Sequence, residues 1–172
     1  GDEAKILSGG HSLIPMMKLR LATPGVLVDI NNIPGLSHIT EDNGVLKIGG
    51  LTRESEVEHS DLLKKHFPIF GDVTKLIADP QVRNRGTLGG NLAHGDAAND
   101  HPAVMLALHA TVVATGADGE REPRAIRSEE GGGGARQDTA GIGLGDIGLD
   151  DGADRVDQDA QRLQAAQVSA CR

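Results

Sequence analysis

The chain has almost no aromatic side chains and a single cysteine. Two of its 172 residues are phenylalanine, and none is tyrosine or tryptophan, so it lacks the stacking surfaces on which RRM-like and OB-like proteins bind single strands. A formal net charge of −8 leaves no basic stripe for a phosphate backbone, which excludes nucleic acid as an expected partner. Cys171 alone forms neither an internal disulfide nor a cysteine-ligated zinc or iron–sulfur site.

Long apolar runs are also missing. No stretch approaches the roughly 18 apolar residues of a membrane span, and no basic segment followed by an apolar one marks a secretory signal. With a cysteine usage that suits a reducing compartment, these absences predict a soluble, intracellular protein located in the cytoplasm.

The composition changes near Gly116. Every lysine, histidine, methionine and phenylalanine lies before that residue, whereas residues 117–172 hold 10 glycines and 12 acidic against 7 basic residues. Low hydrophobicity with excess charge is typical of a segment that cannot offset its ordering entropy. We therefore expect one domain at residues 1–122 and a disordered tail at residues 123–172.

The first 116 residues alternate between strand-like and helix-like patterns, which predicts an α+β domain with mixed, partly antiparallel pairing. Strands are expected at residues 4–7, 26–30, 38–41, 45–48 and 111–115, and helices at residues 13–21, 53–59, 68–78 and 102–109, with a further helix after Ser60. Asn43-Gly44 predicts a type I′ hairpin turn. Thr52 and Ser60 are expected to cap the helices that follow them.

Three more local expectations follow from spacing. The helix at 13–21 is expected to be short and buried, with Met16 and Met17 as core residues. In the helix at 68–78, one apolar face is expected from Ile69, Phe70, Val73, Leu76 and Ile77. The acidic residues of the preceding helices, Glu54, Glu56, Glu58 and Asp61, are expected to form a solvated face.

Two segments with paired glycines carry the chemistry. The first is Ser8-Gly9-Gly10-His11-Ser12, between a strand and a helix, and the second is Arg85-Gly86-Thr87-Leu88-Gly89-Gly90-Asn91. Adjacent glycines permit positive φ and close backbone approach, so successive N–H groups can form an anion-binding nest. A single such segment is more often structural, but two of them with hydroxyl and amide donors can hold a diphosphate from opposite sides.

Common nucleotide motifs do not fit these segments. Neither matches G-x-G-x-x-G, and neither has the Gly-Lys-Ser or Gly-Lys-Thr of a P-loop. A Rossmann or P-loop interpretation is therefore disfavoured. One longer segment runs from Ser8 through Leu13-Ile14-Pro15-Met16-Met17-Lys18-Leu19-Arg20, and another runs from Gln81 to Asp100 and includes His94 and Asp96. These two segments resemble the flavin-binding segments of the medium subunits of aerobic carbon monoxide dehydrogenases, which are members of the molybdenum hydroxylase family.

The resemblance covers about residues 1–122 and implies a PCMH-type FAD-binding fold. It implies that FAD is bound, chiefly at its pyrophosphate, by the first segment, Ser8, Gly9, Gly10, His11 and Ser12, and by the second, Thr87, Leu88, Gly89, Gly90 and Asn91. By the same resemblance, Leu13 and Leu88 pack near the cofactor, and Asp100, with Asp96 as a weaker candidate, accepts hydrogen bonds from sugar hydroxyls. A strand–helix unit is expected upstream of residue 1.

Partners and activity also follow from the resemblance. It implies an electron-transfer subunit that works with a large molybdenum-cofactor subunit and a small [2Fe-2S] subunit, and that passes electrons from the iron–sulfur clusters by way of the flavin to a quinone-type acceptor. No catalytic side chain is expected on this chain. The alternatives are the flavoprotein subunit of a xanthine- or aldehyde-oxidising hydroxylase, or a fragment that binds a nucleotide without redox activity.

The remaining clusters favour structural roles. His94, Asp96, His101 and His109 match no common metal-ligand spacing, so no metal site is expected. Arg83 and Arg85 are equally consistent with contacts to phosphate and with anchoring of the segment to backbone carbonyls.

The composition of residues 124–172, which has no lysine and contains the run Gly131–Gly134, leads to a prediction about the gene. We expect this stretch to be out-of-frame sequence from a GC-rich gene, with an ordinary flexible linker as the alternative. Translation of the coding DNA in the other two frames should give a continuation that contains lysine and aromatic residues. If neither frame does so, the stretch is a linker.

Overall fold

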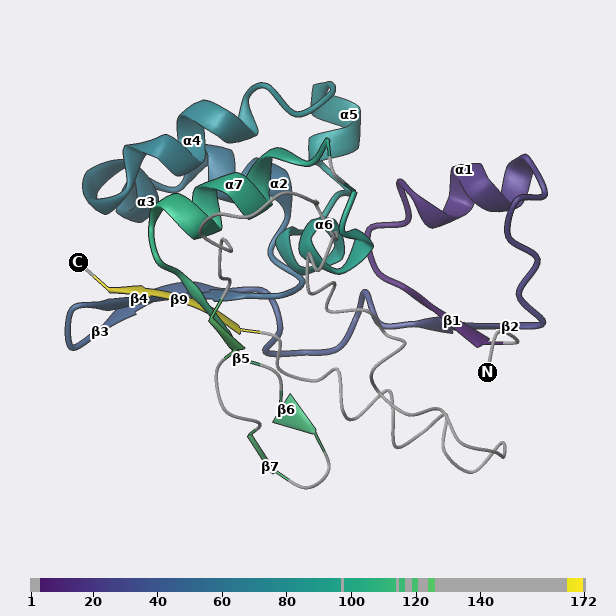
Figure 1. The fold of residues 1–172 in the computed structure, drawn as a ribbon, viewed down its shortest axis with the longest axis horizontal. Coiled ribbons are helices and arrows are strands. Elements are labelled where there is room, and N and C mark those ends of the chain that lie inside the picture. Colours follow the sequence, from purple (N-terminus) through teal and green to yellow (C-terminus); the bar gives the residue numbers. More distant parts are fainter. Residues whose placement is uncertain are drawn as a thin grey trace, which may run out of the picture.

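The computed structural model describes residues 4–96 and 98–113, together with the backbone of four short segments, 115–116, 119–120, 124–125 and 167–171. Two groups of elements lie side by side in Figure 1. In the larger group, helices cover one face of a five-stranded sheet, and in the smaller group a single helix lies beside a two-stranded sheet.

The elements confirm the predicted α+β class. The helices are α1 (Leu13–Lys18), α2 (Glu54–His59), α3 (Asp61–His66), α4 (Pro68–Thr74), α5 (Pro80–Arg83), α6 (Leu88–His94) and α7 (Asp100–Ala107). The strands are β1 (Ala4–Leu7), β2 (Val26–Asp29), β3 (Ile39–Asp42), β4 (Val45–Gly49), β5 (Thr111–Val113), β6 (Thr115–Gly116), β7 (Gly119–Glu120), β8 (Arg124–Ala125) and β9 (Gln167–Cys171). Parallel and antiparallel pairs both occur, as expected.

The larger sheet is antiparallel, with strand order β3-β4-β9-β5-β8. Its β3–β4 hairpin turns at Asn43 and Gly44, whose φ angles of 52° and 82° are the two positive values that a type I′ turn needs. The register pairs Ile39 with Ile48. This confirms the predicted hairpin.

Strand β9 differs from the expectation of a disordered tail. Residues 167–171 lie between β4 and β5, and Val168 is in register with both Ile48 and Val112. The physical reason is local, because β4 and β5 each offer a row of backbone groups to an inserted strand, which a composition averaged over the whole tail does not reveal. Most of the remaining residues of the tail, and with them the rest of that expectation, lie outside the described residues.

The main core lies between the helices and the five-stranded sheet. Helices α2, α3, α4, α6 and α7 supply its most buried side chains, which are Val57, Leu63, Phe70, Leu88 and Met105, all 0% exposed. Leu46, Ile48 and Val112 close it from the sheet side. Packing in this core thus fixes the positions of α6 and α7 relative to β4.

Of the two predicted helix caps, one is present and the other is not. Ser60 caps α3 as predicted, because its Oγ accepts the N–H of Leu63 at 3.2 Å. Thr52 does not cap α2, so that prediction is wrong. The Thr52 hydroxyl instead donates to the carbonyl of His38 at 3.0 Å and accepts the His38 N–H at 3.2 Å, while Arg53 occupies the N-cap position.

Helix α4 is shorter than the predicted helix at 68–78. It ends at Thr74, and Asp79 caps the next helix, α5, by accepting the N–H of Gln81 at 2.8 Å. Phe70 is buried as expected, but Ile69 and Leu76 are exposed, so the predicted apolar face is only partly formed. The chain turns before Leu76 can reach the core.

The smaller group exposes much of its apolar surface. Strands β1 and β2 form a two-stranded parallel sheet, and α1 has no buried residue. The expectation of a buried helix with Met16 in the core is therefore wrong, since no described element covers α1 in Figure 1 and Leu19 and Leu21 beyond it are about 70% exposed. Within the described residues, none of the helices has the length and apolar character needed to cross a membrane.

Candidate functional site

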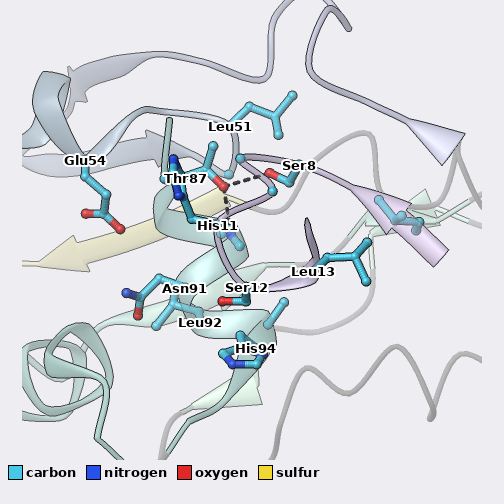
Figure 2. A pocket seen from close by; sticks show the side chains of 18 of the residues that line it. Ser8, His11, Ser12, Leu13, Leu51, Glu54, Thr87, Asn91, Leu92 and His94 are labelled. Atoms are coloured by element: carbon cyan, nitrogen blue, oxygen red, sulfur yellow. Dashed lines mark hydrogen bonds between the residues drawn. The ribbon is translucent and has the colours of Figure 1, made fainter. Parts of the chain in front are cut away.

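The two glycine segments, far apart in sequence, meet at one point. The hydroxyl oxygens of Ser8 and Thr87 lie 2.7 Å apart and share a hydrogen bond, drawn as a dashed line in Figure 2. A Cβ on Gly9 would overlap the carbonyl oxygen of Arg85 and lie 2.9 Å from the Cα of Gly86. Gly9 is therefore required by the contact between the two segments.

The second segment is mostly helix. Thr87 is the N-cap of α6, and its Oγ1 accepts the N–H of Gly90 at 3.1 Å. A Cβ on Gly89 would lie 2.6 Å from the Gly50 carbonyl oxygen, and one on Gly90 would lie 2.6 Å from Thr87 Oγ1. Glycine within a helix costs stability, but at Gly89 it is needed because the helix packs directly on the backbone of Gly50, and at Gly90 because the Thr87 hydroxyl lies against it.

The N–H groups at the start of α6 already have partners in the protein. Leu88 donates to the carbonyl of Thr52 at 3.0 Å, Gly89 to that of Gly50 at 2.9 Å, and Asn91 to that of Thr87 at 2.9 Å. With Gly90 bonded to the Thr87 side chain, none of these four donors is left for a ligand. In the second segment, the groups that remain for a ligand are therefore the side chains of Thr87 and Asn91, and not the backbone N–H groups.

The first segment is different. In the part of the chain that the structure describes, no acceptor takes the backbone N–H of any residue from Gly9 to Leu13. Gly10 has the positive φ of 83° that lets the chain turn here. Five successive free donors are the kind of backbone arrangement that can bind an anion.

The Ser8–Thr87 pair adds one hydroxyl proton. Thr87 Oγ1 accepts from Gly90, and one of the two hydroxyls must donate to the other. Whichever donates, the second keeps a proton for another acceptor. Because both residues line the same pocket, that proton is available to a ligand.

Asn31 and Arg53 connect the two segments. Asn31 Nδ2 donates to the carbonyl of Ser8 at 2.8 Å, and its Oδ1 accepts from Arg53 Nη2 at 2.9 Å. Arg53 Nη1 reaches the carbonyl of Arg85 at 2.5 Å. Neither residue was singled out from the sequence, because their partners are backbone carbonyls brought close only by the fold.

Asp29, at the end of β2, holds Asn31 in place. Its Oδ1 accepts the backbone N–H of Asn31 at 2.9 Å and the Nδ2 group at 2.7 Å. These two hydrogen bonds, with a smaller contribution from the charge of Arg53, lower the pKa of Asp29 below its usual value against the opposing effect of desolvation. The ionised carboxylate is therefore the form that orients Asn31.

A pocket of about 620 Å³ opens beside this junction, within the range of small-molecule sites. Ten of the thirteen predicted site residues line it, as Figure 2 shows in part. They are Ser8, Gly9, Gly10, His11, Ser12, Leu13, Thr87, Gly89, Gly90 and Asn91. The two segments predicted to act together thus share one pocket.

The other three predicted residues do not line the pocket. Leu88 is fully buried in the main core. Asp96 is exposed and accepts the N–H of Ala98 at 2.8 Å, and Asp100 is an exposed residue at the start of α7. Contacts of Asp96 and Asp100 with sugar hydroxyls stay predictions from the resemblance.

Several residues that the sequence did not single out for binding also line the pocket. Glu54 and Asn99 are among them, and Asn99 Nδ2 donates to the carbonyl of Asn91 at 2.9 Å. The side-chain oxygen Oδ1 of Asn91 is buried and has no partner among the described residues. A buried acceptor of this kind suits a hydroxyl or N–H donor on a ligand.

Part of the predicted acidic face and Arg83 make defined contacts. Glu54 and Glu58 are not solvated, contrary to the expectation, because α2 turns them toward other helices. Glu58 Oε2 accepts from Arg83 Nε at 2.8 Å, and Arg83 Nη1 donates to the carbonyl of Ile77 at 2.9 Å. Arg83 is thus an anchor for backbone carbonyls, one of the two roles left open by the sequence.

Comparisons with known proteins show what the first part of the chain is similar to. The sequence family described as "FAD binding domain in molybdopterin dehydrogenase" matches residues 1–127. The chain is 50% identical over 121 residues to the carbon monoxide dehydrogenase medium chain of Hydrogenophaga pseudoflava, covering 70% of this chain and 42% of that protein. It is 47% identical over 122 residues to the 6-hydroxypseudooxynicotine dehydrogenase complex subunit alpha of Paenarthrobacter nicotinovorans, covering 71% and 41%.

Solved structures give the same picture. Carbon monoxide dehydrogenase from Hydrogenophaga pseudoflava matches with a TM-score of 0.68 and 51% identity over 70% of this chain and 42% of that one. Quinoline 2-oxidoreductase from Pseudomonas putida 86 matches with a TM-score of 0.69 and 36% identity, covering 73% and 44%. The chain spans about two fifths of the length of the two curated relatives, from Hydrogenophaga and Paenarthrobacter.

The contact at Gly9 predicts a position-specific cost of adding a methyl group. Gly9→Ala should destabilise the chain by about 1–3 kcal/mol, since the new Cβ meets backbone that cannot rotate away. Gly71→Ala, in α4, is the matched control, because its Cβ would meet nothing closer than 3.6 Å and a helical alanine should raise stability slightly. Urea denaturation of both variants measures this, and equal stabilities would contradict the close-approach argument.

The lowered pKa of Asp29 predicts a pH window. Its contribution to stability is present above about pH 3.9, the usual value of an unfolded aspartate, and is lost as the pH falls through the lower value of the folded state. Asp29→Ala should therefore be less stable than the wild type at pH 5 to 7, and the difference should shrink below pH 4. Asp72→Ala removes an exposed carboxylate whose partner among the described residues is Lys75, and serves as control. A difference that grows in acid would refute the assignment.

Proposed function

Because the chain belongs to the family of FAD-binding domains of molybdopterin dehydrogenases, we propose that the pocket between its two glycine segments binds FAD. We further propose that it is the flavin-binding part of a molybdenum hydroxylase of the carbon monoxide dehydrogenase type. The observation that carries the proposal is the row of free N–H groups from Gly9 to Leu13, which line the pocket and have no acceptor among the described residues.

The residues present fit the cofactor. A pyrophosphate accepts hydrogen bonds only, so it suits five unpaired N–H donors and the spare hydroxyl proton of the Ser8–Thr87 pair. The buried Oδ1 of Asn91, which has no partner among the described residues, suits a donor on the flavin or its ribityl chain. Leu13 adds apolar surface to the wall.

The chain's own residues would bind and orient, without acting as acid, base or nucleophile. FAD, when bound, supplies one- and two-electron redox chemistry. Asn31 and Arg53 hold the two segments together through backbone carbonyls, so the donors are in place before a ligand arrives. Preorganised donors lower the ordering cost of binding.

Partners and the direction of electron flow belong to the same proposal. A large molybdenum-cofactor subunit and a small [2Fe-2S] subunit would complete the enzyme, which would deliver electrons to a quinone-type acceptor in the cytoplasm. The named relatives include medium chains of carbon monoxide dehydrogenase and proteins named for a nicotine derivative and for quinoline. The run from Leu13 to Arg20 favours the carbon monoxide type, with xanthine- or aldehyde-type hydroxylases and a non-redox nucleotide-binding fragment as the alternatives.

Flavin retention tests the proposal directly. The chain, mixed with FAD and desalted, should keep the visible absorption of oxidised flavin. Gly90→Val should lose it, because the side chain would strike Thr87 Oγ1 and reach toward Ser8, whereas Gly71→Ala should keep it. Far-ultraviolet circular dichroism of each variant confirms folding, and a folded wild type that retains no flavin would sink the proposal.

Asn91 offers a finer test. Asn91→Ala removes an oxygen that no described residue uses, so stability should change little while FAD affinity falls about fivefold to tenfold, the worth of one hydrogen bond. Asn32→Ala, at an exposed position outside the pocket, is the control. Titration of flavin fluorescence measures both affinities, and an unchanged affinity in Asn91→Ala would remove Asn91 from the site.

A further inference from the structure

One acidic side chain lines the pocket without a hydrogen-bond partner. Glu54, the first residue of α2, is 2% exposed and forms part of the pocket wall. Its Oε2 atom is buried and is bonded to no described residue. Buried side-chain oxygens nearly always have a partner, and an oxygen that lacks one costs stability. None of the contacts proposed above for FAD involves this carboxyl group.

The fold directs the Glu54 side chain toward the pocket. Its backbone N–H donates to the carbonyl of Gly86 at 3.0 Å, which holds the start of α2 against the second glycine segment. A Cβ on Gly86 would lie 3.1 Å from Glu54 Cγ, so glycine at this position leaves room for the acidic side chain. Figure 2 shows Glu54 and Asn91 at one side of the pocket and Leu13 at the other.

No arginine is paired with Glu54 in the part of the chain that the structure describes. The guanidinium of Arg53 is bonded to a backbone carbonyl and an amide oxygen, and Arg83 Nε is bonded to Glu58 Oε2 at 2.8 Å. Nδ1 of His101 lies 3.4 Å from Glu54 Oε2, and neither atom has a hydrogen-bond partner among the described residues. The start of a helix favours an acidic residue but does not require it to be buried.

From these observations we propose that Glu54 accepts a hydrogen bond from the ligand and helps to select it. An O–H or N–H group of the ligand would give the buried oxygen the partner that the protein does not supply. The free N–H groups from Gly9 to Leu13 suit an anion. Glu54 and the Asn91 oxygen suit a hydrogen-bond donor instead, and a carboxylate at that end disfavours a phosphate.

The pocket thus accepts a ligand that carries an anionic group and, apart from it, a hydrogen-bond donor. FAD, which enters here through the proposed function, has hydroxyl and N–H donors on both sides of its pyrophosphate. Glu54 then determines which way round such a ligand binds. The role is one of specificity, and no proton is transferred.

Stability and affinity should respond differently when the carboxyl group is removed. Glu54→Met replaces it with an apolar side chain of similar length. The urea midpoint should stay the same or rise, because a buried acceptor without a partner is lost. FAD affinity, measured by titration of flavin fluorescence, should fall about tenfold to a hundredfold, the worth of a hydrogen bond to a charged group. Glu54→Gln keeps one acceptor oxygen, so its loss of affinity should be smaller.

Glu58→Met is the matched control on the same helix. Glu58 is bonded to Arg83 and does not line the pocket. Its removal leaves a largely buried guanidinium without its carboxylate, so the urea midpoint should fall. The FAD affinity of the folded variant should stay at the wild-type value. The two glutamates of α2 are therefore expected to show opposite patterns.

Two results would overturn the inference. A folded Glu54→Met that binds FAD as tightly as the wild type shows that the ligand does not use the carboxyl group, whatever the urea midpoint. A urea midpoint that falls as far as in Glu58→Met shows that the group has a structural role. In both cases a wild type that retains flavin leaves the proposed function standing, whereas a folded wild type that retains none removes both.

ADP identifies which half of FAD supplies the donor. It contains the adenosine and the pyrophosphate but not the flavin half, and its affinity is measured by displacement of FAD. If Glu54→Met weakens ADP as much as FAD, the donor belongs to the adenosine half. If only FAD is weakened, the donor belongs to the flavin half. Either pattern supports Glu54 as a ligand-binding residue, and a variant that weakens neither ligand contradicts it.

Discussion

The contact between the two glycine segments is the constraint on which the rest of the site depends. Gly9 lies so close to the carbonyl of Arg85 that no side chain fits between them, and the hydroxyls of Ser8 and Thr87 close the contact. This junction joins the small sheet of β1 and β2 to the layer of helices over the large sheet. The two segments also differ in their hydrogen bonds. The N–H groups at the start of α6 bond within the protein, whereas those from Gly9 to Leu13 have no acceptor among the described residues.

Features set by neighbours in sequence could be predicted, and features set by distant partners could not. The turn at Asn43 and Gly44 and the cap at Ser60 need only local residues, and both are present. Thr52 has the chemistry of a cap, but a tertiary bond to His38 competes for its hydroxyl. The helix at the second glycine pair was not predicted either, because nothing in the sequence shows that Gly50 would lie against Gly89.

The sequence predicted which residues line the candidate site better than it predicted which residues hold them in place. The paired glycines pointed to the two segments and the resemblance supplied the individual residues, ten of which line one pocket. Asn31 and Arg53 carry no motif, because they bind backbone carbonyls whose positions depend on the finished fold. Glu54 was hidden for a different reason: on a helix with several acids, spacing alone does not say which carboxylate faces inward.

Strand β9 has a consequence for the order in which the sheet assembles. The β3–β4 hairpin closes over two residues, whereas β9 joins β4 across more than a hundred, with Val45 in register with Cys171. Each doubling of a closing loop costs only about 0.6 kcal/mol in stability, but distant pairings slow folding far more than they weaken the folded state. We expect the hairpin and helices to form early, with the central gap of the sheet filled last.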